Sequence, residues 1–227
     1  MIIQIYAFAK IEIMLQAVAA GVDQIGFIAG IYDLVHGELD FRSASTLARE
    51  VPKPAKSVAL TMSTDINEIL RMAELVHPDI LHISSETDAV GIDQMAEIRA
   101  RLDPTTQLMK AIAVADQNSI DTAVHFASVS DILLLDTKAK GFPGVGATGK
   151  THDWKLSREI VARSPVSVIL AGGLNAQNVR SAIQSVNPWG VDSNTSTNIP
   201  GDPLVKDIVR IQEFVKAVRI AGKAETL

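Results

Sequence analysis

The stretch Val168-Ile-Leu-Ala-Gly-Gly-Leu-Asn175 decides the fold of this chain. An apolar run that begins with two β-branched residues ends in two glycines, and apolar side chains then recur at helical spacing. Those later apolar positions are Val179, Ala182, Ile183 and Val186. The pattern predicts a buried strand, a tight turn and an amphipathic helix that Asn175 opens.

Gly172 and Gly173, the two glycines of this turn, also indicate a binding site for phosphate. Because neither has a Cβ atom, a phosphate can approach their backbone N–H groups, and the positive end of the following helix dipole favours an anion. A strand-to-helix turn without a ligand is the alternative, which an isolated Gly-Gly pair would favour. The rest of the sequence reverses that preference.

The composition favours a globular α/β protein. The 227 residues are 47% hydrophobic and 21% charged, which is enough apolar content for one sizeable core without a division into domains. Aromatic residues make up only 4%, and the small and branched side chains that remain suit the layers of an α/β fold. The net charge of -5, with acidic residues scattered along the chain, argues against nucleic acid or an anionic membrane as a partner.

The sequence contains no cysteine, which excludes a disulfide framework and a thiolate metal site. His36, His77 and His152 and the nearby carboxylates lack the spacing of metal ligands on one helix face, and we expect no metal. Residues 1–7 lack the basic and long apolar segments of a signal peptide, and no later run reaches membrane-spanning length. We therefore expect a cytoplasmic protein.

Strand and helix patterns alternate along the whole chain. Strands are expected at residues 2–7, 24–29, 56–62, 79–83, 107–114, 131–135, 168–171 and 189–191. Helices are expected at residues 11–20, 43–50, 66–75, 91–102, 119–126 and 153–163, from residue 175 onward, and at 202–221. Eight such pairs predict an α/β fold, a (β/α)8 TIM barrel that forms a single domain over residues 1–227. An open doubly wound sheet is the alternative, although it usually has fewer strands.

Several motifs lie just beyond the expected strands, where a (β/α)8 barrel places its functional residues. In order they are Ile132-Leu-Leu-Leu-Asp136-Thr, Gly146-Ala-Thr-Gly-Lys-Thr-His-Asp-Trp154, the glycine stretch, and Gly190-Val-Asp192. Together they resemble the successive motifs of the phosphoribosylanthranilate isomerase family of tryptophan biosynthesis. The resemblance implies a small barrel that converts a phosphorylated aminoaldose into an aminoketose by an Amadori rearrangement, with no metal or organic cofactor.

The resemblance assigns the family's general acid to Asp136. This residue follows an apolar strand at the expected mouth of the barrel, where apolar surroundings would raise the pKa of the carboxyl and keep it protonated enough to donate. An aspartate that caps a helix or stabilises a turn is the alternative. The resemblance further implies that the substrate and its phosphate contact Ser84, Asp192, Gly172, Gly173, Asn194, Thr195 and Ser196.

Two positions depart from the family pattern in ways that bear on the chemistry. Tyr6 stands where the family has its cysteine base, and a tyrosine could accept a proton only if its pKa were well below the usual value of about 10. A binding or packing aromatic is the alternative. In the loop after the second strand, the position of the family's carboxylate-binding arginine falls near Asp40, with Arg42 two places further on. An inward Asp40 would favour an amine and an inward Arg42 the usual carboxylate, but loop length hides the register.

Two further departures concern other loops of the barrel. Ser84 replaces the family's histidine after the fourth strand, and His82, two residues earlier on the same strand face, is expected to be a core residue at a lower layer. After the eighth strand, Ser196 and Asn198 replace the family's glycine and glutamate. Hydroxyls and amides can still bind phosphate, so phosphate binding remains the expectation.

Three functions are consistent with these observations. The first is isomerisation, by a monomer or homodimer, of the family's substrate or of a related phosphorylated sugar amine. The second is a non-catalytic barrel that binds a phosphorylated sugar. The third is nucleotide hydrolysis, because Gly144–Thr151 fits the P-loop pattern Gly-x-x-x-x-Gly-Lys-Thr. A barrel has no second nucleotide-binding half, and a loop that closes over the substrate is the preferred interpretation of that segment.

Overall fold

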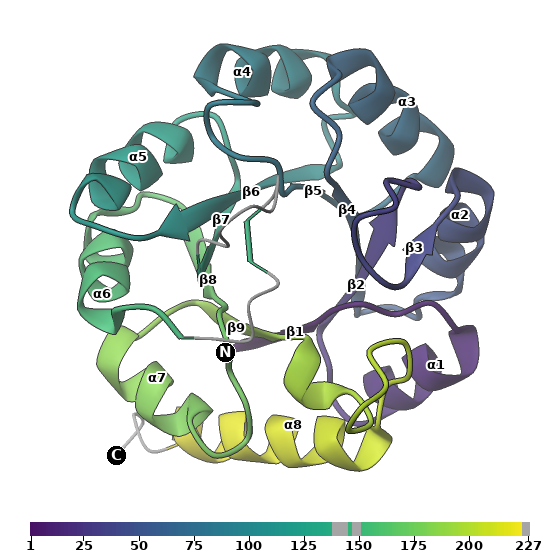
Figure 1. Cartoon of the computed structure of the whole chain (residues 1–227), viewed down its shortest axis with the longest axis vertical. Coiled ribbons are helices and arrows are strands. Elements are labelled where there is room, and N and C mark those ends of the chain that lie inside the picture. The colour runs from purple at the N-terminus through teal and green to yellow at the C-terminus, as the bar shows by residue number, and fades with distance from the viewer. Residues whose placement is uncertain (138–144, 147–150, 224–227) are drawn as a thin grey trace.

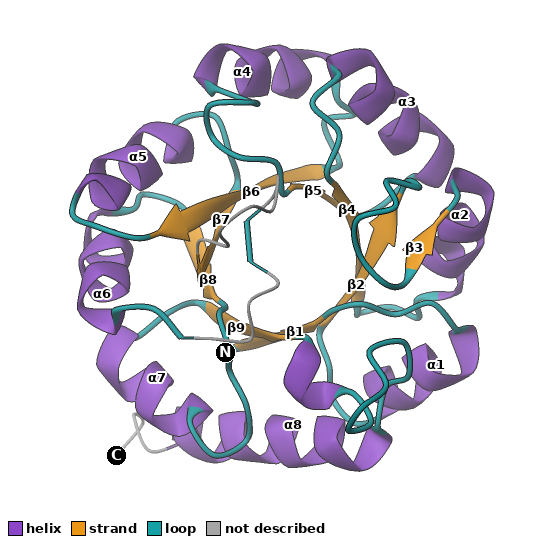
Figure 2. Cartoon of the chain, viewed as in Figure 1, coloured by secondary structure: helices purple, strands orange, loops and turns teal. Residues whose placement is uncertain are grey.

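The computed structural model describes residues 1–137, 145–146 and 151–223, and it shows a ring of strands inside a ring of helices (Figure 1, Figure 2). The strands are β1 (Ile2–Ile5), β2 (Gln24–Ala29), β3 (Glu38–Leu39), β4 (Lys56–Thr61), β5 (Ile80–Ile83), β6 (Gln107–Val114), β7 (Ile132–Thr137), β8 (Ser167–Leu170) and β9 (Gly190–Ser193). The helices are α1 (Ile11–Ala19), α2 (Phe41–Glu50), α3 (Ile66–Val76), α4 (Ile92–Arg101), α5 (Asn118–Ala127), α6 (Trp154–Arg163), α7 (Val179–Val186) and α8 (Ile208–Lys223), with a 3₁₀ helix η1 (Thr195–Thr197).

Strand pairing closes the sheet into a barrel. Strand β1 pairs in parallel with both β2 and β9, and the remaining neighbours follow in the order β9-β8-β7-β6-β5-β4-β2. The two-residue strand β3 pairs with the end of β2 outside this ring. The predicted (β/α)8 barrel is confirmed, and the open doubly wound sheet is excluded because no barrel strand is left with an unpaired edge.

The core has two layers because successive strand residues point to opposite faces. Ile80 and Met109 pack inside the barrel, whereas their chain neighbours Leu81 and Leu108 pack outward in the larger layer beneath the helices. All four side chains are fully buried. None of the described helices is long and apolar enough to cross a bilayer.

The helix after the glycine stretch begins later than its sequence pattern predicts. Helix α7 starts at Val179, four residues beyond Asn175. The Asn175 side chain accepts hydrogen bonds from the backbone N–H groups of Gln177 and Asn178, at 2.9 and 3.0 Å, and so caps a turn that precedes the helix. The N–H of Val179 closes this turn by donating to the Asn175 carbonyl at 3.0 Å. The segment between the glycines and α7 is therefore a tight turn.

Two other element boundaries affect the site. Strand β7 continues through Asp136, so this residue lies in the end of the strand and not in the loop after it. Helix α8 begins at Ile208 and not at residue 202, because Asp207 accepts a hydrogen bond from the N–H of Val209 at 2.9 Å and so opens the helix. The residues before it form a separate loop that is bridged between Asn198 and Lys206.

Candidate active site

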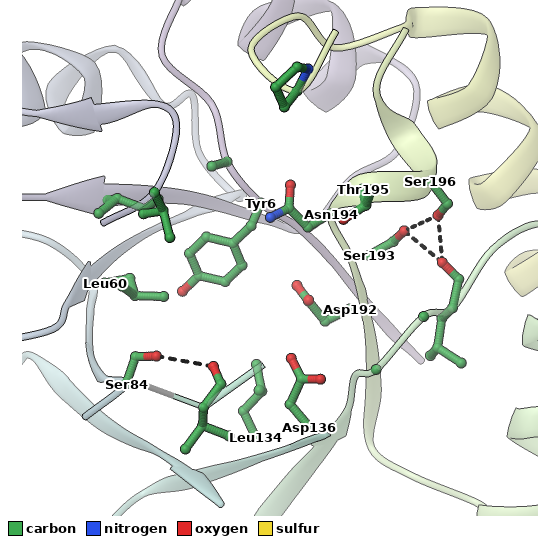
Figure 3. A pocket seen from close by; sticks show the side chains of 18 of the residues that line it. Tyr6, Leu60, Ser84, Leu134, Asp136, Asp192, Ser193, Asn194, Thr195 and Ser196 are labelled. Atoms are coloured by element: carbon green, nitrogen blue, oxygen red, sulfur yellow. Dashed lines mark hydrogen bonds between the residues drawn. The ribbon is translucent and has the colours of Figure 1, made fainter. Parts of the chain in front are cut away.

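A cavity of about 540 Å³ lies at the carboxyl ends of the barrel strands, where this fold places its functional residues (Figure 3). It is lined by strand-end and loop residues that include most of the residues predicted from the sequence. Those predicted residues are Tyr6, Ser84, Asp136, Gly172, Gly173, Asp192, Asn194, Thr195 and Ser196. Two predicted substrate contacts, Asp40 and Arg42, do not line the cavity.

Asp136 is positioned by its own strand end and by the segment above it. Its Oδ1 accepts hydrogen bonds from the backbone N–H and the hydroxyl of Thr137, at 2.6 and 3.2 Å. Gly146 lies against the other oxygen, because a Cβ at this residue would stand only 2.3 Å from Oδ2. Residues 145–146 are tied to the loop that follows β5 by the N–H of Val145, which donates to the carbonyl of Ser84 at 2.9 Å. Desolvation by these surroundings raises the pKa of Asp136 to about 6, the direction predicted for a general acid.

Asp192 is a second buried carboxyl in the same cavity. It lies on β9, is 7% exposed, and accepts a hydrogen bond from Gln4 Nε2 at 3.1 Å. Burial, with a smaller effect of the negative charge of Asp136, raises the pKa of Asp192 to about 7. In Figure 3 both carboxyl groups project into the same space. The site therefore contains a pair of carboxyls that interact electrostatically.

Tyr6 forms a hydrogen-bonded pair with His82 across the barrel. The distance from Tyr6 Oη to His82 Nδ1 is 2.8 Å, and both side chains are buried. Burial, with a smaller effect of the positive charge of Lys110, lowers the pKa of His82 to about 3, so the imidazole is neutral. A neutral ring accepts at Nδ1 when its proton is on Nε2, and with this tautomer we assign the Tyr6 hydroxyl as the donor. The buried position of His82 agrees with its expected place in the barrel core.

The environment of Tyr6 opposes the general-base role predicted for it. That role requires a pKa well below 10, but burial, together with the negative charge of Asp192, raises the pKa of the phenol well above 10. The hydroxyl keeps its proton and uses it in the bond to His82. The structure thus favours the alternative, in which Tyr6 packs and binds, because its surroundings disfavour a phenolate.

The two loops that are predicted to bind phosphate are tied together beside the cavity. Gly172 and Gly173 both have positive φ values, 86° and 61°, which favour glycine. The hydroxyls of Ser193 and Ser196 lie 2.7 Å apart, and each contacts the carbonyl of Leu174, at 2.9 and 2.5 Å (Figure 3). The Ser196 hydroxyl therefore connects the loops.

Backbone N–H groups remain available beside these hydroxyls. Within the described residues, the N–H groups of Gly172, Gly173 and Thr195 donate no hydrogen bond. These three residues line the cavity. Unpaired N–H groups at glycines and at a helix start are typical of phosphate sites.

Asp40 and Arg42 lie outside the cavity, which corrects their predicted role in substrate binding. Asp40 caps helix α2, where its Oδ1 accepts a hydrogen bond from the N–H of Ser43 at 2.7 Å, and Arg42 is exposed in the first turn. A side chain that caps a helix turns toward that helix and away from the barrel axis.

The loop after β2 lines the cavity through residues that the sequence did not indicate. Leu34, Val35 and His36 face it. Glu38 fixes this loop, because its carboxylate accepts hydrogen bonds from four consecutive N–H groups, those of residues 32–35, at 2.8 to 3.0 Å. The sequence did show a glutamate, Glu38, shortly after the expected turn. Its role in holding the loop could not be predicted, because that role depends on how the loop folds back onto the carboxylate.

Lys206 is another residue that sequence analysis missed. The pattern placed it inside a helix at 202–221, where a lysine is ordinarily exposed to solvent, yet it is 5% exposed beneath the loop that follows β9.

Most of the P-loop-like segment Gly144–Thr151, with Lys150, lies outside the described residues. Within the described part of the chain, no three His, Cys, Asp or Glu side chains gather as metal ligands would.

Comparison with known proteins agrees with this geometry. The sequence pattern of the family described as N-(5'-phosphoribosyl)anthranilate (PRA) isomerase matches residues 4–217. N-(5'-phosphoribosyl)anthranilate isomerase 1 of Methanosarcina mazei is 32% identical over 231 aligned positions, which cover 97% of this chain and 95% of that protein. The N-(5'-phosphoribosyl)anthranilate isomerase of Beijerinckia indica is 33% identical, over 89% of this chain and 87% of that protein. The crystal structure of the phosphoribosyl anthranilate isomerase of Thermotoga maritima superimposes with a TM-score of 0.80 at 26% identity, covering 96% of this chain and 99% of that one. The chain therefore belongs to the N-(5'-phosphoribosyl)anthranilate isomerase family.

Proposed function

We propose that this chain isomerises N-(5'-phosphoribosyl)anthranilate, or a closely related phosphorylated ribosylamine, by an Amadori rearrangement. The reaction needs a general acid that protonates the ribose ring oxygen and a general base that removes the proton from C2. The observation that carries the proposal is the pair of carboxyls Asp136 and Asp192, both with raised pKa values, in one cavity at the barrel mouth. The membership in the isomerase family supports the same reaction.

Asp136 is proposed as the acid and Asp192 as the base. Proton transfer from Asp136 to the ring oxygen breaks the C1–O bond and leaves a C1 iminium ion. Removal of the C2 proton by Asp192 then gives an enaminol, which becomes the aminoketose when C1 takes up a proton and the 2-hydroxyl loses one. The two carboxyls titrate as a pair near neutral pH, and the reactive form has the proton on Asp136 and Asp192 ionised. This form is the minor singly protonated one, because the pKa of Asp192 is the higher of the two.

The remaining cavity residues bind and orient the substrate in this proposal. The unpaired N–H groups of Gly172, Gly173 and Thr195 receive the phosphate. Tyr6 and His82 line the inner wall of the cavity, and the Tyr6 hydroxyl keeps its proton in the hydrogen bond to His82. All of these groups belong to one copy of the chain, so the reaction proceeds in a monomer or in each subunit of a homodimer.

A second candidate function is a barrel that binds a phosphorylated sugar without turnover. The raised pKa of Tyr6 favours it, because the residue at the position of the family's base cannot take that role. Adding purified protein to phosphoribosylanthranilate and following the loss of its fluorescence separates the two candidates. Turnover supports the isomerase. Absence of turnover, with ribose 5-phosphate still protecting the protein against thermal unfolding, supports the binding barrel.

The pH dependence of turnover is expected to be bell-shaped, with its maximum between pH 6 and 7 where the pKa values of Asp136 and Asp192 lie. At lower pH both carboxyls are protonated and the base is lost, whereas at higher pH both are ionised and the acid is lost. Measuring kcat/KM across this range tests the expectation. A rate that keeps rising well above pH 8 would instead indicate an acid of much higher pKa.

Replacing Tyr6 by phenylalanine is expected to lower kcat by less than about tenfold, because a general base contributes about 10²- to 10⁴-fold and Tyr6 is not the base. Stability should fall by about 1–3 kcal/mol, since the buried His82 Nδ1 loses the hydrogen bond from Tyr6. The matched control is Tyr32→Phe, which removes a hydroxyl bonded to the carbonyl of Ala29 at 2.9 Å outside the cavity. A drop of more than a hundredfold in Tyr6→Phe alone would restore Tyr6 as the base.

A further inference from the structure

Lys206 lies buried beneath the loop that follows β9 and holds that loop through hydrogen bonds. Its Nζ carries three N–H donors and lies within hydrogen-bond distance of four acceptors. These are the backbone carbonyl and the side-chain oxygen of Asn194, both at 3.0 Å, Thr197 Oγ1 at 3.1 Å and Asn198 Oδ1 at 2.5 Å. The side chain is 5% exposed and does not line the cavity itself. Every acceptor of this ammonium group belongs to residues 194–198, so Lys206 fixes the shape of this loop.

The ammonium group has no carboxylate in contact with it. Within the described residues Lys206 forms no ion pair, and Asn198 offers a neutral amide oxygen where the family pattern has a glutamate. Asp192 acts on it through charge without forming a bond, and burial lowers the pKa of Lys206 to about 7. A buried cation without a paired anion is costly, and an anion bound nearby stabilises it.

The carbonyl of Asn194 links Lys206 to the cavity. This carbonyl and the N–H of Thr195 belong to the same peptide group, and that N–H, beside the cavity, donates to no acceptor in the described part of the chain. A cation that binds the oxygen of a peptide group polarises it and strengthens donation from its N–H. The charge of Lys206 therefore strengthens the hydrogen bond that the Thr195 N–H can donate to a ligand, by polarising the peptide group between them.

We propose that Lys206 is a positioning residue that supplies the positive charge for phosphate binding, acting through the Asn194–Thr195 peptide group without touching the ligand. This inference rests on the proposed function, since it concerns the phosphate-binding part of that site. The bound phosphate, in turn, provides the counter-charge that Asn198 does not.

Two variants of the intact chain test the proposal with ribose 5-phosphate and inorganic phosphate as probes. Lys206→Met removes the charge, and Asn198→Asp places a carboxylate of the same size against Lys206 and neutralises it. Lys216→Met, an exposed lysine of α8, is the matched control. Calorimetric titration should give a Kd at least tenfold higher for both probes in Lys206→Met and Asn198→Asp, and an unchanged Kd in the control.

Turnover provides a second readout that a general loss of structure would not produce. A charge that acts on the phosphate binds the ground state and the transition state alike, so KM should rise about tenfold while kcat changes less than about threefold. If wild type and Asn198→Asp bind the probes with equal affinity, the inference about Lys206 is overturned while the proposed function still stands. The Asn198→Asp variant gives this test even if Lys206→Met does not fold. Failure of wild type to bind either probe would overturn the proposed phosphate site and the inference with it.

Discussion

The variant Asp136→Asn is expected to have a kcat about 10²- to 10⁴-fold below that of wild type, the range that a single general acid contributes. An amide cannot release a proton to the ribose ring oxygen, so the first step of the proposed reaction slows. The substitution preserves the shape of the side chain, and its oxygen can still accept the Thr137 N–H bond that now measures 2.6 Å. Binding of ribose 5-phosphate should therefore remain within a few fold of wild type.

Asp93→Asn is the matched control for this variant. Asp93 is an exposed carboxylate in the first turn of α4, on the outer ring of the barrel, and its replacement should leave turnover unchanged. Steady-state kinetics and a calorimetric titration of both variants make the comparison. Turnover of Asp136→Asn at more than a tenth of the wild-type rate would show that another group donates the proton.

The variant Asp192→Asn should show the other large loss, again about 10²- to 10⁴-fold in kcat, because an amide cannot accept the C2 proton. The bond from Gln4 Nε2, now 3.1 Å, can be kept by the amide oxygen, so the barrel interior should stay intact. The low-pH limb of the rate profile should disappear in this variant, since the group whose ionisation it reports is gone. The residual activity should depend on pH only through loss of the acid.

The pH profile distinguishes this role for Asp192 from simple substrate binding. A binding residue would change KM and leave both limbs of the profile in place. Measuring kcat and KM of Asp192→Asn between about pH 5 and 9, beside Asp93→Asn, supplies both quantities. A variant with raised KM, nearly normal kcat and two intact limbs would assign Asp192 to binding and leave the base to another residue.

Local sequence signals located the elements well where no tertiary contact competes with them. The strand expected at 107–114 is β6, Gln107–Val114, because its apolar run is buried on both faces. Asp65, a residue type that favours helix N-caps, precedes α3, and its side chain accepts a hydrogen bond from the N–H of Asn67 at 2.8 Å. The start of α7 differs from its prediction by four residues, because Asn175 caps a turn that precedes the helix, and the N–H of Val179 closes that turn on the Asn175 carbonyl at 3.0 Å.

The sequence by itself determined the order of strands and helices and favoured a closed barrel, because apolar periodicity gives eight strand and helix pairs. Its resemblance to the isomerase family indicated the strand-end residues that meet in the cavity. Only the tertiary structure decided how those residues behave. Tyr6 contacts His82 from 76 positions away, and Gln4 contacts Asp192 from 188 positions away. Burial and charge at such contacts set the pKa of each group, place Asp40 on a helix end and enclose Lys206, and neither burial nor charge through space can be read from neighbouring residues in the chain.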